Sequence, residues 1–118
     1  MTDMTKAQAE RVDMAIEEAS EVIKELCKAS RFGFDSYHPN DPSETNADRV
    51  TAEFADMIAV LELMVEANDP VKMPSREQIE AAKDRKVSWS KHQPIRPAKA
   101  HTAAQEAMER AWDSDEAK

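Results

Sequence analysis

Glycine, cysteine and aromatic residues are scarce in this chain. Glycine occurs once, at Gly33, cysteine occurs once, at Cys27, and aromatic residues make up 5% of the 118 residues. Sheets need turn glycines together with β-branched and aromatic side chains, so this composition favours helices. A single cysteine cannot form an intramolecular disulfide. We expect Cys27 to be a small core residue on the apolar side of the first helix.

Long apolar runs and an excess of positive charge are also missing. The longest apolar stretch, 57–65, is interrupted by Glu62 and is too short to span a bilayer. The formal net charge is −8, so we expect no nucleic acid polymer as a partner, because phosphate contact requires clustered Lys and Arg. A bridging cation would still allow binding of phosphate groups. The N-terminus has no apolar signal segment, so we expect a cytoplasmic protein without a membrane partner.

Apolar periodicity predicts two long helices, over about 5–32 and 47–67. The connecting segment 34–46 contains two prolines and several small polar residues, so we expect a loop there. Either Thr45 or Asn46 is expected to cap the second helix. The apolar stripe of the first helix is expected to face the core: Val12, Ala15, Ile16, Ala19, Val22, Ile23, Leu26 and Cys27.

Two further helices are expected after the long pair. Ser75 and Gln78 have the spacing of a capping box, which predicts the start of a third, basic helix. An alanine-rich stripe predicts a tail helix over 98–112. We therefore expect an all-α bundle with a domain over 1–92, then a linker and tail helix in 93–118. The second helix is apolar over most of its circumference, so we expect oligomerisation to complete the bundle.

Two acidic patterns carry the functional prediction. Glu17, Glu18 and Glu21 lie on adjacent turns, on the side of the first helix opposite its apolar stripe. Taken alone they are typical of a solvated helix face. Glu53 and Asp56, however, interrupt an apolar surface of the second helix. Carboxylates in such a place need a cation or hydrogen bonds.

The required cation is either a basic side chain, for which Arg49 is the nearby candidate, or a metal ion. Mg²⁺ takes oxygen ligands and commonly combines one or two carboxylates with substrate phosphates. A di-iron site of the ferritin type is disfavoured because the chain has no Glu-x-x-His motif. We expect His38, His92 and His101 to be surface residues.

The composite pattern, E-E-x-x-E at 17–21 followed by E-x-x-D at 53–56, resembles the signature of the all-α nucleoside triphosphate pyrophosphohydrolases. That superfamily includes MazG-like proteins, dimeric dUTPases and phosphoribosyl-ATP pyrophosphohydrolase. The flanks of the two motifs are similar as well. They include Lys28, Arg31-Phe32-Gly33, Asn46 and Arg49, and the resemblance covers about 9–89.

The resemblance implies hydrolysis of the α–β phosphoanhydride of a (deoxy)nucleoside triphosphate to a monophosphate and pyrophosphate. Mg²⁺, with Mn²⁺ as a substitute, would be held by Glu17, Glu18, Glu21, Glu53 and Asp56. The implied catalytic residues are Glu18, Glu21 and Glu53, one of which would act as base toward the attacking water.

The resemblance also implies phosphate-binding residues and a homodimer or homotetramer. The basic candidates are Lys83, Lys86 and Arg85 on the third helix, then Lys28 and Arg31, and Asn46 is the candidate for nucleotide contact. Two alternatives stay open. One is a non-catalytic helical interaction module, and the other is a hydrolase of a different pyrophosphate such as phosphoribosyl-ATP.

Overall fold

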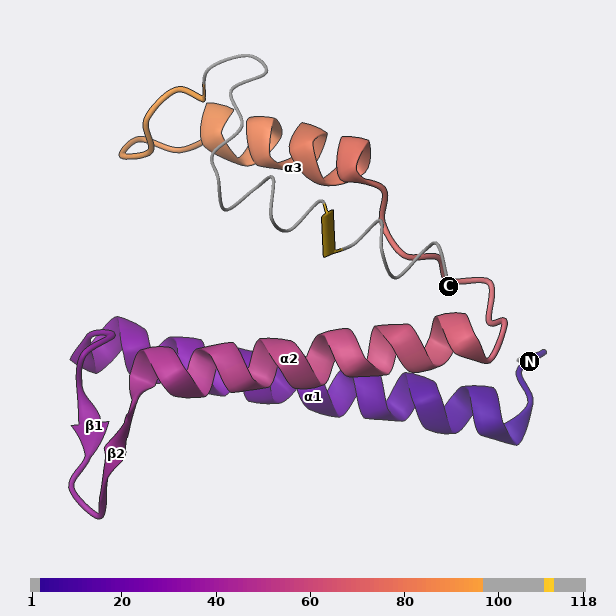
Figure 1. Ribbon diagram of the computed structural model, residues 1–118, viewed down its shortest axis with the longest axis horizontal. Helices are drawn as coiled ribbons and strands as arrows, with labels where there is room; N and C mark the ends of the chain where they lie inside the picture. The colour runs from indigo at the N-terminus through magenta and orange to yellow at the C-terminus, as the bar shows by residue number, and fades with distance from the viewer. Residues whose placement is uncertain (1–2, 97–109, 112–118) are drawn as a thin grey trace. The chain divides into compact units, whose positions relative to one another are not determined.

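The computed structural model describes residues 3–96 and 110–111. The chain divides into two compact units, Met1–Met73 and Pro74–Lys118, and each is described by itself. The first unit holds two long helices joined by a small hairpin (Figure 1), and the second holds a shorter helix. In chain order the elements are α1 (Lys6–Phe32), β1 (Tyr37–His38), β2 (Asp41–Thr45), α2 (Asn46–Glu66) and α3 (Arg76–Ser88).

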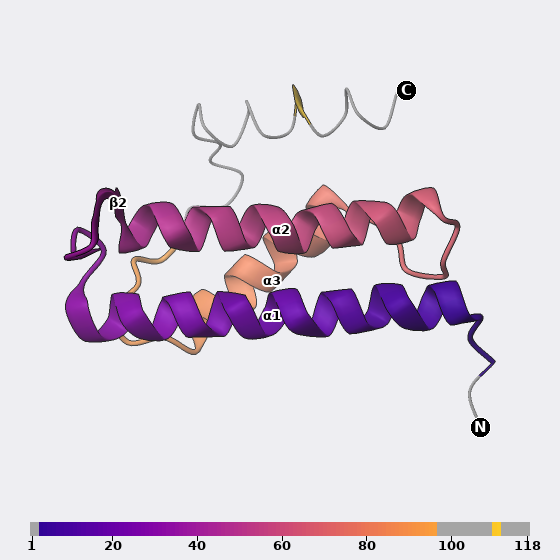
Figure 2. The same ribbon diagram turned by 90° about the horizontal axis from the view of Figure 1, so that it is seen from below.

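The two long helices run antiparallel and lie side by side in both views (Figures 1 and 2). Their N-termini are closed by capping boxes, with Thr5 and Gln8 on α1 and Thr45 and Asp48 on α2. In each box the threonine hydroxyl accepts from a backbone N–H, while the partner side chain accepts from the threonine N–H. Thr45 is therefore the cap of α2, and Asn46 is its first residue. The predicted pair of long helices is confirmed.

The contact between α1 and α2 follows a heptad-like repeat. We use the name seam for the two rows of buried or half-buried residues that recur at alternating steps of three and four. This spacing keeps one stripe of a helix against one partner over many turns. On α1 the row is Gln8, Arg11, Ala15, Glu18, Val22, Glu25 and Ala29; on α2 it is Asn46, Val50, Glu53, Met57, Val60 and Met64.

The predicted apolar stripe of α1 is only partly the packing face, which corrects the sequence-based expectation. Ile16 and Ile23 are 63% and 62% exposed, and Cys27 is exposed as well. Ile16 and Ile23 come one position after the seam residues Ala15 and Val22, so a 3.5-residue repeat turns them away from α2. Cys27 is not a core residue of the described chain.

The segment predicted as a loop contains a two-stranded antiparallel hairpin. Tyr37 pairs with Thr45 and His38 with Asp41, with an irregularity between the two pairs. The expectation of an all-α chain is thus confirmed for the helices and wrong for this segment. Tyr and Thr are residues that favour strands, and the hairpin is tied to the helices at its base. There the Asn46 N–H donates to the Ser36 carbonyl at 2.8 Å, and Asn46 Nδ2 donates to the Gly33 carbonyl at 2.9 Å.

The second unit begins as expected. Ser75 caps α3, and Gln78 completes the capping box. The predicted tail helix at 98–112 lies outside the described residues except for Arg110 and Ala111, which are helical. Among the described residues no helix has the length and apolar character needed to cross a membrane.

Candidate metal centre

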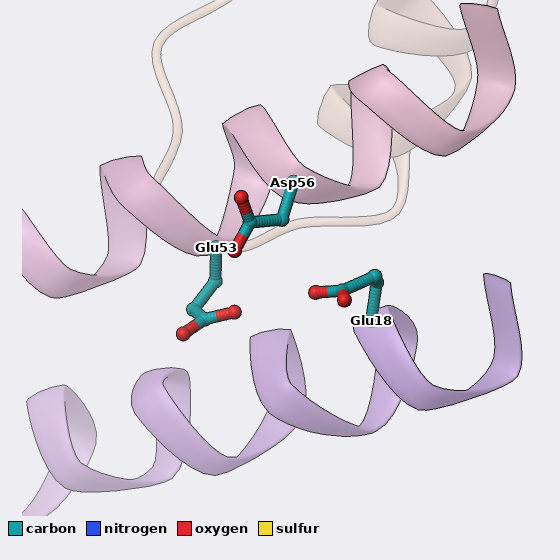
Figure 3. Close-up of side chains that lie close together, drawn as sticks. All are labelled: Glu18, Glu53 and Asp56. Atoms are coloured by element: carbon teal, nitrogen blue, oxygen red, sulfur yellow. The ribbon is translucent and has the colours of Figure 1, made fainter. Parts of the chain in front are cut away.

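Three of the five predicted acidic ligands converge across the seam. Glu18 of α1 and Glu53 and Asp56 of α2 each offer a carboxylate oxygen, and these oxygens all lie within 4.8 Å of one another. Figure 3 shows Glu53 and Asp56 descending from α2 toward Glu18, which rises from α1. Glu18 and Glu53 are half-buried, and Asp56 is exposed. We call these three residues the carboxylate triad.

The triad is electrostatically unfavourable without a cation. Burial raises the pKa of Glu18, and the negative charges of Asp56 and Glu53 raise it further. Burial likewise raises the pKa of Glu53. Among its charged neighbours, Asp56 raises this pKa most. Both glutamates therefore hold a proton more readily than an ordinary carboxyl group. A divalent cation among the three oxygens would reverse this effect.

The other two predicted ligands lie beside the triad. The charge of Glu21 raises the pKa of both Glu18 and Glu53, so Glu21 is close enough to act on each. Its carboxylate is 3.8 Å from Lys24 Nζ. Glu17 is exposed and acts on Glu18 through its charge alone. The prediction that Glu17 and Glu21 are ligands stays a prediction.

Glu18 occupies a different place from the one expected from its sequence pattern. The residues of the first motif were expected opposite the packing face of α1, yet Glu18 is a seam residue that faces α2. The reason is that the packing face is the seam, not the stripe of largest apolar residues. Glu18 is thus directed at Glu53 by the same repeat that places half-buried Val22 in the seam.

Glu25 is a further acidic residue of the seam that the motif does not contain. It is 5% exposed, and its Oε1 lies 3.3 Å from Lys28 Nζ. Its charge also raises the pKa of Glu53. Glu25 follows Glu18 by seven residues, so the heptad spacing is the sequence signal that points to it.

A pocket of about 310 Å³ lies where the ends of the helices meet the hairpin. Two predicted residues, Lys28 and Asn46, line it together with Arg49, and aromatic walls come from Phe32 and Tyr37. Arg49 bonds to Asp41 at 3.3 Å, so it is not the cation partner of Glu53 and Asp56 that the sequence allowed. The pocket therefore combines cationic and aromatic groups on the same helix pair as the triad.

The remaining predicted residues of this helix pair have structural contacts. Asn46 is 6% exposed, and its side-chain amide holds the Gly33 carbonyl. The Arg31 guanidinium lies over the Phe32 ring at 5.2 Å from its centroid, which is a cation–π distance. Nucleotide contact by Asn46 and phosphate contact by Arg31 stay predictions.

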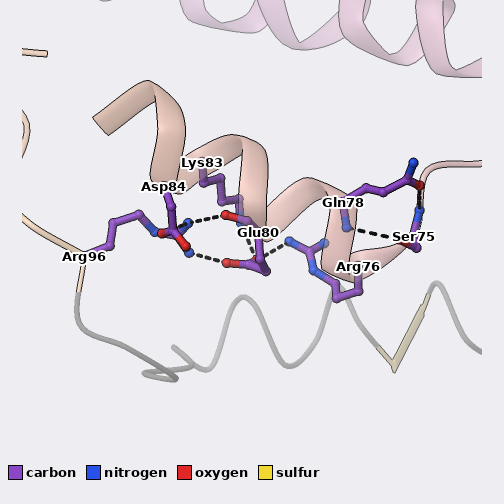
Figure 4. A network of polar contacts seen from close by, with 7 residues as sticks. All are labelled: Ser75, Arg76, Gln78, Glu80, Lys83, Asp84 and Arg96. Atoms are coloured by element: carbon purple, nitrogen blue, oxygen red, sulfur yellow. Dashed lines mark hydrogen bonds and ion pairs between the residues drawn. The ribbon is translucent and has the colours of Figure 1, made fainter. Parts of the chain in front are cut away.

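The three basic candidates of α3 do not share one surface. Lys83 and Lys86 line a hollow of about 480 Å³, whereas Arg85 lines a different one. Lys83 Nζ lies 2.9 Å from Glu80 Oε1. Arg76 and Arg96 bond to the same carboxylate (Figure 4) and, with Lys83, hold the pKa of Glu80 far below its usual range. Lys86 is therefore a better candidate for phosphate contact than Lys83.

The donor set of the triad suits a hard divalent cation. Mg²⁺ prefers carboxylate oxygens and retains several waters. Two oxygens on opposite sides of one Mg²⁺ lie about 4.2 Å apart, twice the usual magnesium–oxygen distance. The spacing of up to 4.8 Å in the triad would have to contract slightly around a single ion. Small rotations of exposed Asp56 can supply that change.

Comparisons of the chain with protein-family models, with curated proteins and with solved structures found no match.

Proposed function

We propose that this protein is a Mg²⁺-dependent nucleotide pyrophosphohydrolase, which converts a (deoxy)nucleoside triphosphate to a monophosphate and pyrophosphate. The observation that carries the proposal is the convergence of Glu18, Glu53 and Asp56 from two helices. Three clustered carboxylates repel one another and also repel phosphates, so the arrangement is useful only with a cation that binds both. Mn²⁺ is the expected substitute.

The proposed reaction is attack of water on the α-phosphorus. The bond to the bridging oxygen breaks, pyrophosphate leaves, and the water proton passes to a carboxylate. Bound Mg²⁺ would supply positive charge for the phosphates and would lower the pKa of a water. Glu18, Glu21 and Glu53 are the candidate bases.

Basic side chains near the triad are proposed to receive the rest of the substrate. Arg49 precedes Glu53 by four residues, so the pocket with Lys28 and Arg49 begins one helical turn from the triad. Lys28 and Arg49 are each paired with a carboxylate, and both would exchange or share that partner on binding an anion. Lys83 and Lys86 belong to the second unit, and phosphate contact by them stays a prediction.

A homodimer or homotetramer is part of the proposal. Ile16 and Ile23 on α1 and Phe54 and Ile58 on α2 are between 46% and 63% exposed. Large apolar side chains in this number along two helices are typical of a surface that a second copy covers.

The test is a screen for pyrophosphate release. The purified chain is incubated with Mg²⁺ or Mn²⁺ and a panel of ribo- and deoxynucleoside triphosphates, extended to phosphoribosyl-ATP and nucleoside diphosphates. Orthophosphate is measured beside pyrophosphate, because a diphosphate yields a monophosphate and orthophosphate. We expect release from at least one triphosphate and none in EDTA. Absence of metal-dependent release across the panel would contradict the proposal. Pyrophosphate release only from phosphoribosyl-ATP, or orthophosphate release only from a nucleoside diphosphate, would identify a hydrolase of another pyrophosphate.

The exposed apolar residues also favour a second candidate, a non-catalytic helical interaction module. That candidate predicts a melting temperature unchanged by Mg²⁺ and nucleotide together. A ligand that binds only the folded state raises its stability by about 2.7 kcal/mol at 100 times its dissociation constant. A clear rise in melting temperature would exclude the module.

A further inference from the structure

Glu25 is a buried carboxylate with only one of its oxygens satisfied. The residue is 5% exposed, and Lys28 Nζ lies 3.3 Å from Oε1. Oε2 is buried and has no hydrogen-bond partner. Burying a charged oxygen without a partner costs free energy. This oxygen therefore indicates a missing ligand.

Glu25 lies in the same seam as Glu18 and Glu53 of the carboxylate triad. It is a seam residue, one turn after Glu21 and two turns after Glu18 on the same helix. Its charge acts on Glu53 across the seam. Glu53 thus experiences negative charge from Glu25 as well as from Asp56 and Glu21.

A cation relieves this arrangement better than a water molecule does. A water could donate a hydrogen bond to Glu25 Oε2, but it would leave the repulsion between Glu25 and Glu53 in place. Lys28 is already bonded to Oε1 and lies on the same helix as Glu25, one turn further on. A divalent cation between the two carboxylates satisfies the orphan oxygen and removes the repulsion.

We propose that Glu25 Oε2 is a ligand of a second divalent cation, bound between Glu25 and Glu53 in the seam. Glu53 would be shared between this ion and the ion of the triad, while Lys28 keeps Oε1. The inference rests on the proposed function only in that both require a cation at Glu53. It extends the site along α1 beyond the E-E-x-x-E motif.

The test counts bound ions. Mn²⁺ is titrated into the full chain and the free ion is measured by electron paramagnetic resonance, for the parent, for Glu25→Gln and for the exposed control Glu62→Gln. We expect two ions per chain for the parent and for the control, and one for Glu25→Gln. A parent that binds fewer than two ions, or a Glu25→Gln variant that still binds two, would overturn the inference.

A second variant distinguishes loss of the cation site from loss of the fold. Glu25→Leu places an apolar side chain at a seam position, so its melting temperature in EDTA is expected to exceed that of the parent. The rise in melting temperature on adding Mn²⁺ is expected to be smaller than in the parent. An unchanged Mn²⁺ response in this folded variant would also overturn the inference.

The same preparations separate this inference from the proposed function. Two bound ions without pyrophosphate release from any triphosphate would leave the second cation site standing and remove the proposed activity. Pyrophosphate release by a parent that binds a single ion would leave the proposed activity standing and remove the second cation site. An absence of Mn²⁺ binding would remove both.

Discussion

Arg11 of α1 and Asp69, just beyond α2, are joined by two parallel hydrogen bonds, 2.7 Å from Nε to Oδ2 and 2.8 Å from Nη2 to Oδ1. Asp69 is 7% exposed, and its N–H donates to the Met64 carbonyl at 3.0 Å. The pair closes the end of the seam opposite the hairpin. Bidentate geometry at a buried position makes this one of the stronger ion pairs that the described chain contains.

Loss of one partner of this pair is expected to destabilise the helix pair. Arg11→Met leaves the buried Asp69 carboxylate unpaired, so the urea midpoint should fall clearly below that of the parent. The double variant Arg11→Met/Asp69→Leu should recover part of the loss, because no charge is then left buried. Lys6→Met, at an exposed position of α1, is the matched control. Equal midpoints for Arg11→Met and Lys6→Met would contradict the prediction.

Glu53→Gln is expected to weaken cation binding and pyrophosphate release together. The substitution keeps the shape of the side chain and removes the charge that belongs to the triad. We expect a loss of Mg²⁺ affinity on the order of tenfold or more, since even supporting residues of metal sites contribute about 10–100-fold. Isothermal titration with Mg²⁺ measures the affinity. Glu62→Gln, exposed on the same helix, should behave like the parent, and equal affinities in both variants would count against the site.

The raised pKa values of Glu18 and Glu53 predict an unusual pH dependence of the cation-free protein. At these two carboxyl groups the folded state binds more protons than the unfolded state. Their contribution to the free energy of unfolding is therefore full below about pH 4.3 and is lost as pH rises through their raised pKa values. Asp69 contributes with the opposite sign, because its pKa is lowered, and its contribution is lost as pH falls.

The double variant Glu18→Gln/Glu53→Gln isolates this effect. In EDTA at pH 7 it is expected to be more stable than the parent, and the difference should shrink toward zero as the pH falls below about 4.3, where both glutamates of the parent are protonated. Urea unfolding at a series of pH values measures the difference. A gain that does not vary with pH would show that the two carboxylates do not repel in the folded chain.

The exposed isoleucines of α1 predict the solution state. A homodimer or homotetramer should have a mass by light scattering that is a multiple of the 13.3 kDa chain. Ile23→Lys is expected to shift this mass to that of one chain, because it places a charge on the apolar surface. Thr51→Lys, at an exposed position of α2, should leave the mass unchanged. A parent that elutes as a single chain would refute the predicted oligomer.

Local sequence signals were sufficient for the helices. Thr45 and Ser75 precede the residues that complete their capping boxes, and both helices begin where those boxes place them. Gly33 directly follows the first helix and caps it with φ of 90°, a conformation that other residues rarely adopt. Such signals act within one turn and need no knowledge of the partner helix.

The packing face of α1 could not be obtained in this way. Ranking its side chains by polarity selects Ile16 and Ile23, which are exposed, and passes over Glu25, which is buried. Which row of a helix is covered depends on the partner, and the repeat of α2 decides it here. The meeting of Glu18 with Glu53 was predictable from the composite motif, whereas the contribution of Glu25 required the seam. The short hairpin was not predicted, because its strands lack a strong local pattern. It depends in part on contacts at its base.

The hydrogen bonds from Asn46 to Gly33 and Ser36 fasten the chain where it leaves α1 and where it enters α2. Because these bonds join the end of α1 to the start of α2, the length of the hairpin between them does not set the alignment of the two helices. Loop-closure entropy grows slowly with length, so extra residues at the tip near Pro39 and Asn40 cost little. The tip is therefore a place where the chain can vary in length while Glu18 and Glu53 stay in register.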